Sequence, residues 1–322
     1  AEAEAIFSGV GILHLGAGGA ILVRGPDAGV FLNGLTTNNV VTLAVGALQP
    51  NLLCATKGKI VHPVLVVRSK PEEFLVLTEE DAGDAVAVHM EAYRVREAVE
   101  LGMVNLTRLD LCGPLAGDAM AALGLDPRAD RGQFREAPLL YPAHALGPLP
   151  RRTVLLPAAL APALTEALLA AQPAARLVGL EAYDEARTWA GVPRLGVDFD
   201  TDFLPAEAGL ESHLSHNKGC YVGQEIHARL HFRGHPNRKL VALRLPATLA
   251  QGLAAGATLY AEGQSVGRIT SLSRLERRGQ RAGIGLLRYQ VTQERPRLAA
   301  APDGEAAIVL APVATDLGAP RA

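Results

Sequence analysis

Residues 218–225 read Lys-Gly-Cys-Tyr-Val-Gly-Gln-Glu, and this octapeptide is the most informative stretch of the chain. It concentrates a cation, a thiol, two glycines and two polar side chains between a segment rich in His and Asn and a basic stretch, Arg229 to Lys239. Loops contribute little to a core, so packing alone does not explain such a concentration of reactive groups. The octapeptide therefore predicts a functional loop that the surrounding fold positions.

The composition bounds the class of protein. The chain has 322 residues, of which 49% are hydrophobic, so it can form two or three domains with sizeable cores. Its formal net charge of −2 argues against a protein that wraps a polyanion. Three cysteines are too few for a disulfide framework and indicate a reducing compartment, so we expect a cytoplasmic protein. No apolar run of about 18 residues appears, and the first five residues do not resemble a signal peptide, so we expect no membrane contact.

Hydrophobic periodicity predicts both helices and strands. The predicted helices span 27–35, 79–100, 117–123, 160–171 and 181–190, the last ended by Gly191 as its C-cap. The predicted strands of the first two-thirds lie at 11–24, 52–55, 60–67, 73–78, 104–112 and 154–156. After a boundary near 234–239, short strands at 240–245, 258–261, 266–272, 282–287 and 306–309 predict a small antiparallel barrel.

Taken with Arg229, Gly234, Arg238 and Lys239, the octapeptide resembles the signature of YgfZ-type folate-binding proteins. These are relatives of the glycine-cleavage T-protein (a GcvT-like aminomethyltransferase) that assist iron–sulfur cluster assembly or repair. Three further stretches are similar to the same family, namely 31–38 (FLNGLTTN), 57–59 (KGK) and 265–271 (SVGRITS). The resemblance extends over most of the chain, and the octapeptide is its specific part.

The resemblance implies a fold, a ligand and a role. The implied fold has two interleaved α+β domains in residues 1–235, the second at roughly 40–115, and a C-terminal antiparallel β-barrel in 236–322. Tetrahydrofolate, or a one-carbon derivative, would sit in a central channel. The implied role is that of a folate-binding accessory protein for iron–sulfur cluster assembly or repair, which thereby supports iron–sulfur enzymes such as tRNA-modifying ones. Expected partners are folate and iron–sulfur proteins or assembly factors, and we expect a monomer.

Cys220 and Lys218 are the predicted reactive residues. A lysine two positions away favours the thiolate if the side chains approach, and a helix beginning near Gly223 adds to that effect. The alternative is a buried structural cysteine, the commonest state of a free thiol. The resemblance favours Cys220 as the functional thiol at the mouth of the channel, with Lys218 tuning its pKa. Cys54 and Cys112 lie in apolar strands, so we expect them in the core.

Other residues of this region are predicted to contact folate. They are Gly219, Tyr221, Gly223, Gln224, Glu225 and Arg229. The two glycines permit positive φ or close backbone approach, as a loop pressed against a flat pterin requires, although ordinary turn glycines are the alternative. Gln224 and Glu225 either bind ring nitrogens or form the polar first turn of a helix at 224–230.

Arg187 and Trp189 complete the predicted folate site. They stand in Ala-Arg-Thr-Trp-Ala-Gly, residues 186–191, which resembles the T-protein helix whose arginine meets the folate tail. A guanidinium can hold carboxylates bidentately, and the alternative for Arg187 is an ion pair with Asp184. Trp189, the only tryptophan, can stack on a pterin or aminobenzoate ring, and core packing is its alternative.

A cluster of histidines raises the question of a metal. Five of the nine histidines fall between His213 and His235, and His227, His231 and His235 are spaced by four. Gly234 and Pro236 interrupt a helix that would place all three on one face. We therefore expect a polar, basic rim and no metal site.

The chain departs from T-proteins at two carboxylates. His62 and Pro63 stand where T-proteins carry an acidic pair that includes the catalytic aspartate. Arg151 and Arg152 stand near the position of a pterin-binding glutamate. Acid–base catalysis needs a titratable group near the substrate, which His62 can supply. If the protein is an enzyme, the resemblance implies a folate-dependent aminomethyltransferase, and the loss of both carboxylates argues against that alternative.

A third reading is an RNA-binding module. Arg229, Arg233, Arg238 and Lys239 form a local basic stretch. The overall charge of −2 and the few aromatic residues argue against direct RNA binding, so we expect no nucleic-acid partner.

Overall fold

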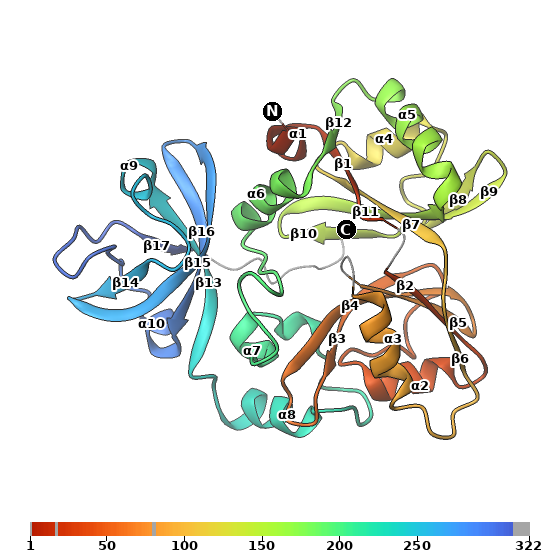
Figure 1. The fold of residues 1–322 in the computed structure, drawn as a ribbon, viewed down its shortest axis with the longest axis horizontal. Coiled ribbons are helices and arrows are strands. Elements are labelled where there is room, and N and C mark those ends of the chain that lie inside the picture. Colours follow the sequence, from red (N-terminus) through yellow and green to blue (C-terminus); the bar gives the residue numbers. More distant parts are fainter. Residues whose placement is uncertain (1, 17–18, 79–81, 312–322) are drawn as a thin grey trace.

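The computed structural model describes residues 2–16, 19–78 and 82–311, whose strands form three sheets (Figure 1). The β1 sheet has the order β12-β1-β7-β11-β9-β8, and β10 pairs with β11. Its strands are β1 (Val10–His14), β7 (Leu106–Cys112), β8 (Arg131–Phe134), β9 (Ala137–Leu140), β10 (Ala143–Leu146), β11 (Leu149–Pro157) and β12 (Ala175–Val178).

The β2 sheet is built from an intervening part of the chain. Its order is β3-β4-β5-β2-β6, and neighbouring strands are antiparallel. Its strands are β2 (Ala20–Arg24), β3 (Leu48–Cys54), β4 (Ile60–Lys70), β5 (Glu73–Leu77) and β6 (Glu100–Met103). The chain thus leaves the β1 sheet after β1 and returns to it at β7. The fold is mixed α+β, as predicted, and the domain division at 235 stays a prediction.

Strand alternation gives each of these sheets an outer and an inner face. On β7, Leu109 and Leu111 pack outward in one cluster with α4 (Ala116–Ala122) and α5 (Ala161–Ala171). Asp110 lies between them in sequence and therefore faces inward. On the other sheet, Ile21 and Val23 pack outward in a cluster with α2 (Ala28–Leu35) and α3 (Gly83–Glu91).

The inner faces of the two sheets meet. Leu75 and Leu77 of the β2 sheet share a buried cluster with Leu155 of the β1 sheet. This contact fixes the two sheets against each other, so polar residues on the inner faces are held in a common interior.

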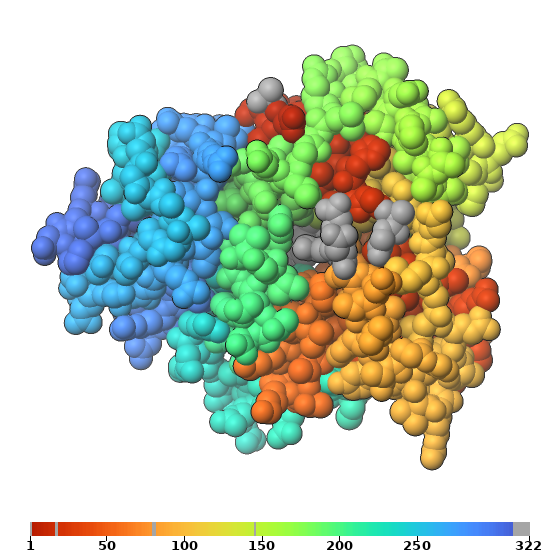
Figure 2. Space-filling model, in the orientation of Figure 1, coloured from red at the N-terminus to blue at the C-terminus, as the bar shows by residue number. Residues whose placement is uncertain are grey.

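The remaining helices are shorter or lie outside the two outer-face clusters. They are α1 (Glu2–Ser8), α6 (Leu180–Ala190), α7 (Pro205–Ala208), α8 (Gln224–Arg233), α9 (Ala247–Ala250), α10 (Tyr289–Glu294) and the 3₁₀ turns Ala158–Leu160 and Glu211–His213. Gly191 ends α6 with φ of 72°, which confirms the predicted C-cap. In Figure 2 the green residues that follow α6 lie between the blue C-terminal sheet and the orange β2 sheet.

The C-terminal part forms a small antiparallel sheet in the order β14-β15-β16-β13-β17. Its strands are β13 (Arg238–Pro246), β14 (Thr258–Ala261), β15 (Gln264–Arg277), β16 (Gln280–Arg288) and β17 (Val309–Ala311). The antiparallel strands were predicted, but the closed barrel is not found among the described residues. Beyond the five strands, only single bridges link Tyr260 with Ala299 and Leu298 with Ile308, because the long connection after β16 is largely irregular.

The predicted helix at 79–100 is wrong over its second half. Helix α3 ends at Glu91, and after a turn the chain forms β6, which pairs with β2. Residues 92–98 carry several charges, and Val95 is 81% exposed, so no apolar stripe continues the helix. Sheet pairing of Leu101 and Met103 with Val23 and Ile21 prevails over helix propensity there. The first residues of the prediction, 79–81, lie outside the described part.

Among the described helices, none combines the length and the hydrophobicity needed to cross a membrane.

Candidate functional site

A cavity of about 570 Å³ lies between the inner faces of the β1 and β2 sheets and the segment 192–213. Its walls include Leu65, Leu77, Leu146, Leu195 and Phe199. Its described polar lining residues are His62, Thr78, Arg108, His144, Arg151, Tyr183, Arg194, Ser212 and His213. Apolar walls with a few convergent polar groups are the usual make-up of a small-molecule site.

Asp110 holds two of the cavity arginines in place. It is fully buried, and it accepts hydrogen bonds from Nε and Nη2 of Arg108 at 3.2 and 3.0 Å and from Nη2 of Arg151. Thr153, its register partner on β11, also donates to it. Burial alone would raise the pKa of Asp110, but Arg108 and Arg151 hold it below its usual range. The cluster therefore keeps one excess positive charge at the cavity wall.

Arg151 also carries an unsatisfied donor. The residue is 8% exposed, and its Nη1 donates to the Tyr183 hydroxyl at 3.1 Å. Its Nε is buried and has no hydrogen-bond partner among the described residues. Buried polar atoms in proteins are nearly always paired, so an orphan donor on a cavity cation suits an anionic ligand.

Arg194 supplies a third cation. Its Nη1 donates to both carboxylate oxygens of Asp184, at 2.8 and 2.9 Å, and its side chain is 29% exposed. Asp184 also accepts from Arg187, whose side chain is 3% exposed, so Arg194 is the more accessible of the two arginines. A ligand carboxylate can therefore recruit Arg194 without leaving Asp184 unpaired.

The cavity histidines are neutral, with His213 buried and His144 half-buried. Burial lowers the pKa of His213 to about 4 and, with the nearby charge of Arg151, lowers that of His144 well below its usual value. None of the described residues that line the cavity is Asp or Glu. The described lining thus presents cationic and neutral groups to a ligand.

The structure places Arg187 outside this described lining. Its Nε donates to Asp184 and its Nη1 to Asp198, each at 2.6 Å, and its Nη2 donates to Ser271 of β15 at 3.1 Å. Arg187 is 3% exposed. The ion pair with Asp184, the alternative from the sequence, is present, and the guanidinium joins α6 to the C-terminal sheet.

Trp189 lies at the same junction. Its Nε1 donates to the carbonyl of Leu275 at 3.3 Å, and the guanidinium of Arg244 lies 5.0 Å from its ring centroid. The side chain is half-buried against the C-terminal sheet and does not line the cavity, which matches the packing alternative.

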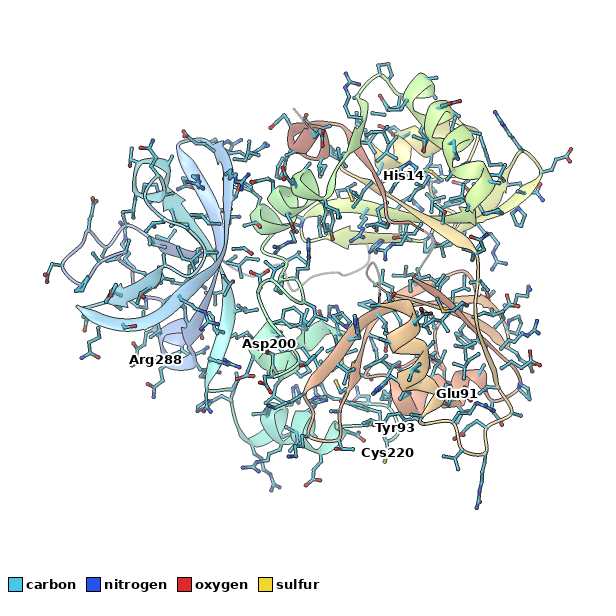
Figure 3. All side chains as sticks on the ribbon, in the orientation of Figure 1. His14, Glu91, Tyr93, Asp200, Cys220 and Arg288 are labelled. Atoms are coloured by element: carbon cyan, nitrogen blue, oxygen red, sulfur yellow. The ribbon has the colours of Figure 1, made fainter. Side chains whose placement is uncertain are left out.

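None of the octapeptide residues lines the cavity either. Val222 packs against the core cluster on the outer face of the β2 sheet, and its N–H donates to the carbonyl of Gly34 at 3.2 Å. Figure 3 shows Cys220 at the lower edge of the molecule. The predicted thiol loop and the cavity are therefore separate sites on one framework.

Lys218 ties this loop to the end of α2. Its Nζ donates to the carbonyls of Thr36 and Asn38, at 2.6 and 2.7 Å, and lies 4.9 Å from the ring centroid of Tyr221. Burial lowers the pKa of Lys218 to about 7, whereas these carbonyls and the ring favour its charged form. None of the described hydrogen bonds joins Lys218 to Cys220, so the lysine positions the loop.

Tyr221 and His227 join the octapeptide to the turn between β3 and β4. The Nε2 of His227 lies 2.7 Å from the Gly58 carbonyl, which can only accept, so this nitrogen carries the proton. The neutral ring then accepts at Nδ1 from the Tyr221 hydroxyl at 3.2 Å. Burial raises the pKa of Tyr221 to about 12 and keeps the hydroxyl protonated.

The remaining predicted residues are at the surface. Cys220, Gly219, Glu225 and Arg229 are exposed, and a Cβ on Gly219 would meet nothing within 4 Å. Gln224 and Glu225 form the first turn of α8, the helical alternative. Cys54 and Cys112 are buried, and burial raises the pKa of each thiol to about 12.

The described histidines and acids form no metal-binding group of three or more. Helix α8 ends at Arg233, before His235. His227 is bonded to Gly58, and the ring of His231 stacks on that of His216 at a centroid distance of 3.8 Å.

Sequence reasoning missed most of the cavity. The sequence marks His62 and Arg151 only as departures from T-proteins, and no motif points to His144, Tyr183 or Arg194. One signal was available on β7, where Arg108 and Asp110 alternate with Leu109 and Leu111 in an otherwise apolar strand. Charges at alternate positions of such a strand point to a polar interior.

The chain is similar to aminomethyltransferases and to an iron–sulfur cluster assembly factor. The profile of the GCVT N-terminal domain matches residues 1–137. An aminomethyltransferase of Corynebacterium aurimucosum is 27% identical over 84% of this chain and 76% of its own length. The human mitochondrial iron–sulfur cluster assembly factor IBA57 is 30% identical over 76% of this chain and 70% of its own length.

One solved structure shares the fold over nearly the whole chain. The glycine cleavage system aminomethyltransferase T of Bartonella henselae superposes with a TM-score of 0.82 at 22% identity, and the match covers 98% of this chain and 88% of that one. The chain belongs to the GcvT-like family, in which its relatives include both aminomethyltransferases and the assembly factor IBA57.

Proposed function

We propose that this protein is a folate-binding accessory factor that supports iron–sulfur cluster assembly or repair. The observation that carries the folate part is the cationic cavity, with the orphan Nε of Arg151 at its wall. The relative named as an iron–sulfur cluster assembly factor, 30% identical to this chain, supports the second part.

Tetrahydrofolate suits the residues present. It joins a flat bicyclic ring to a tail that ends in carboxylates, and the cavity volume of about 570 Å³ lies within the range of small-molecule sites. Arg151 and Arg194 would hold the carboxylates, and Phe199 with the leucine walls would cover the ring. Bound tetrahydrofolate supplies a carrier for one-carbon units.

The thiol loop would serve the iron–sulfur partner. Cys220 is exposed and lies apart from the cavity lining, so a protein partner can reach it while folate is bound. Lys218 and the contact with the β3–β4 turn position this loop. Exposed thiols persist in reducing compartments, so we propose that the protein is cytoplasmic. We also propose that its clients include iron–sulfur enzymes such as tRNA-modifying ones.

Complementation tests this proposal. In cells that lack the protein, the wild type is expected to restore the activity of iron–sulfur enzymes, whereas Cys220→Ser and Arg194→Ala are expected to restore it poorly. Arg277→Ala is the matched control, because Arg277 is 33% exposed and its described contacts are with Glu4 and the ring of Phe7, away from the cavity lining. Full restoration by the Cys220 and Arg194 variants would remove both residues from the account.

Aminomethyl transfer is the alternative function, favoured by the relatives that carry that name. The assay is ammonia release from an aminomethylated lipoyl carrier with tetrahydrofolate. We expect no turnover above background, because no carboxylate occurs among the described cavity residues. Sustained turnover would assign the protein to this alternative.

A further inference from the structure

The outer face of α8 carries an exposed stripe of large side chains. Arg229 is four residues from both Glu225 and Arg233 and three residues from Phe232, so the four side chains share one face of the helix. All four are exposed, and Phe232 is 69% exposed. The opposite face carries buried His227 and packs on the turn around Gly58. The stripe is therefore held outward by a well-packed helix.

The ring of Phe232 is supported by two histidines. His231 meets it edge-on at a centroid distance of 4.7 Å, and His216 lies 6.1 Å away. His216 in turn stacks on His231. An aromatic side chain fixed in this way loses little freedom on binding, which is a property of anchor residues in protein interfaces.

Two unpaired cations share this face with Phe232. Arg229 and Arg233 form no ion pair with any described carboxylate. By contrast, Arg238 and Lys239, just beyond α8, pair with Glu207 and Glu211.

We propose that the Phe232 face, defined as Glu225, Arg229, Phe232 and Arg233, docks a protein partner through an apolar pocket bordered by carboxylates. Phe232 fills the pocket, and the two arginines meet the carboxylates. Cys220 is exposed in the loop that leads into α8. Only the expectation that this partner is an iron–sulfur protein rests on the proposed function.

A protein fits this surface better than a nucleic acid. Binding along a phosphate backbone uses a longer cationic track, and here only two arginines among the described residues of this face accompany one aromatic ring, with Glu225 beside them. The stripe is also too short for a stable dimer of this chain, because one ten-residue helix buries far less than the roughly 1,000 Å² that a lasting interface takes, whereas a transient protein contact needs less area.

Photocrosslinking tests the proposal. The full-length protein carries benzoyl-phenylalanine in place of Phe232, and the control carries it in place of Val88, which is 72% exposed on α3. Adducts formed in cells are purified and their partners identified by mass spectrometry. We expect one dominant adduct, specific to position 232, with a protein that is acidic at its crosslinked surface.

Purified partner and protein then give the quantitative test. Phe232→Ala is expected to weaken binding about 30-fold or more, and Arg229→Glu with Arg233→Glu is expected to weaken it further and to flatten its salt dependence. The matched Val88→Ala variant is expected to bind as wild type. Equal adducts at both positions, adducts removed by nuclease, or adducts with a second copy of this chain would overturn the proposal.

The two proposals fail separately. Phe232→Ala is expected to bind tetrahydrofolate as wild type, because α8 does not line the cavity. An acidic partner without iron–sulfur chemistry would keep the docking surface and remove the assembly role. Absence of any position-specific adduct, with folate binding intact, would remove the docking surface alone.

Discussion

Gly58 and Gly223 lie with their backbones in contact, and this contact joins the octapeptide to the β3–β4 turn. A Cβ on Gly223 would lie 2.9 Å from the Cα of Gly58 and 2.8 Å from the carbonyl oxygen of Ala55. Both glycines have positive φ, 85° at Gly223 and 74° at Gly58. Gly223 of the octapeptide and Gly58 therefore serve close packing of two loops that are about 165 positions apart in the sequence.

Gly223→Ala is expected to lower the free energy of unfolding by about 2 kcal/mol or more, because it adds backbone strain and a clash with main-chain atoms. Denaturant unfolding measures the change. Gly219→Ala is the control, because its Cβ would enter open space, and it is expected to stay within about 0.5 kcal/mol of wild type. Equal losses in the two variants would contradict the close contact.

Lys218→Met separates a positioning role from a thiol-tuning role. We expect the variant to lose about 1–3 kcal/mol of stability, because the carbonyls of Thr36 and Asn38 lose their donor. Cys220 should react with a thiol reagent at least as fast as in wild type, since no described hydrogen bond links it to Lys218. Slower reaction with a raised thiol pKa would show that the lysine tunes the thiol. Lys70→Met, which breaks one exposed ion pair, is the control.

Asp110→Asn is expected to cost about 3–5 kcal/mol of stability, because Arg108 and Arg151 would keep buried charges without their carboxylate. Glu100→Gln is the control, since it breaks the exposed pair with Arg24 and is expected to cost less than about 1 kcal/mol. Unfolding of both variants at neutral pH gives the comparison. Similar costs would mean that the buried cluster is not held by the charge of Asp110.

Acid is expected to destabilise the protein through His213. Its pKa is about 4 in the fold against 6.5 for an unperturbed histidine, so the unfolded chain binds more protons between these values. Stability therefore falls as pH drops from 6.5 towards 4, by up to about 3 kcal/mol from this residue. His144 acts in the same direction. His213→Gln should show a shallower loss across this range, and an unchanged slope would contradict the assignment.

Much of the fold could be predicted from local pattern. The end of α6 at Gly191 was predicted correctly, because a glycine in the left-handed conformation commonly terminates a helix. The prediction of a helix over 79–100 failed in its second half, because β6 forms there by pairing with β2, about 80 residues earlier in the chain. The prediction of a closed C-terminal barrel also failed. The number of strands does not determine the path of the last connection, which depends on contacts between distant segments.

The site was harder to predict because its residues come from distant segments. Arg108, Arg151 and Arg194 meet only because β7, β11 and the segment after α6 border one interior. The role inferred for Arg187 came from a resemblance in α6. The sequence offered the local ion pair with Asp184, but the contacts with Asp198 and Ser271 depend on how the later segment and β15 fold against α6. Lys218 shows the same limit, because sequence proximity to Cys220 said nothing about the carbonyls it contacts.

Calorimetric titration with tetrahydrofolate tests the central claim most directly, with wild type, Arg194→Ala and the matched Arg277→Ala compared. Loss of one charge-assisted contact of about 1.5–3 kcal/mol predicts about 10- to 100-fold weaker binding for Arg194→Ala and unchanged binding for Arg277→Ala. Asp184 keeps Arg187 as a partner, so the fold should tolerate the first change. Absence of saturable binding by the wild type, or equal binding by all three proteins, would contradict a folate site in this cavity.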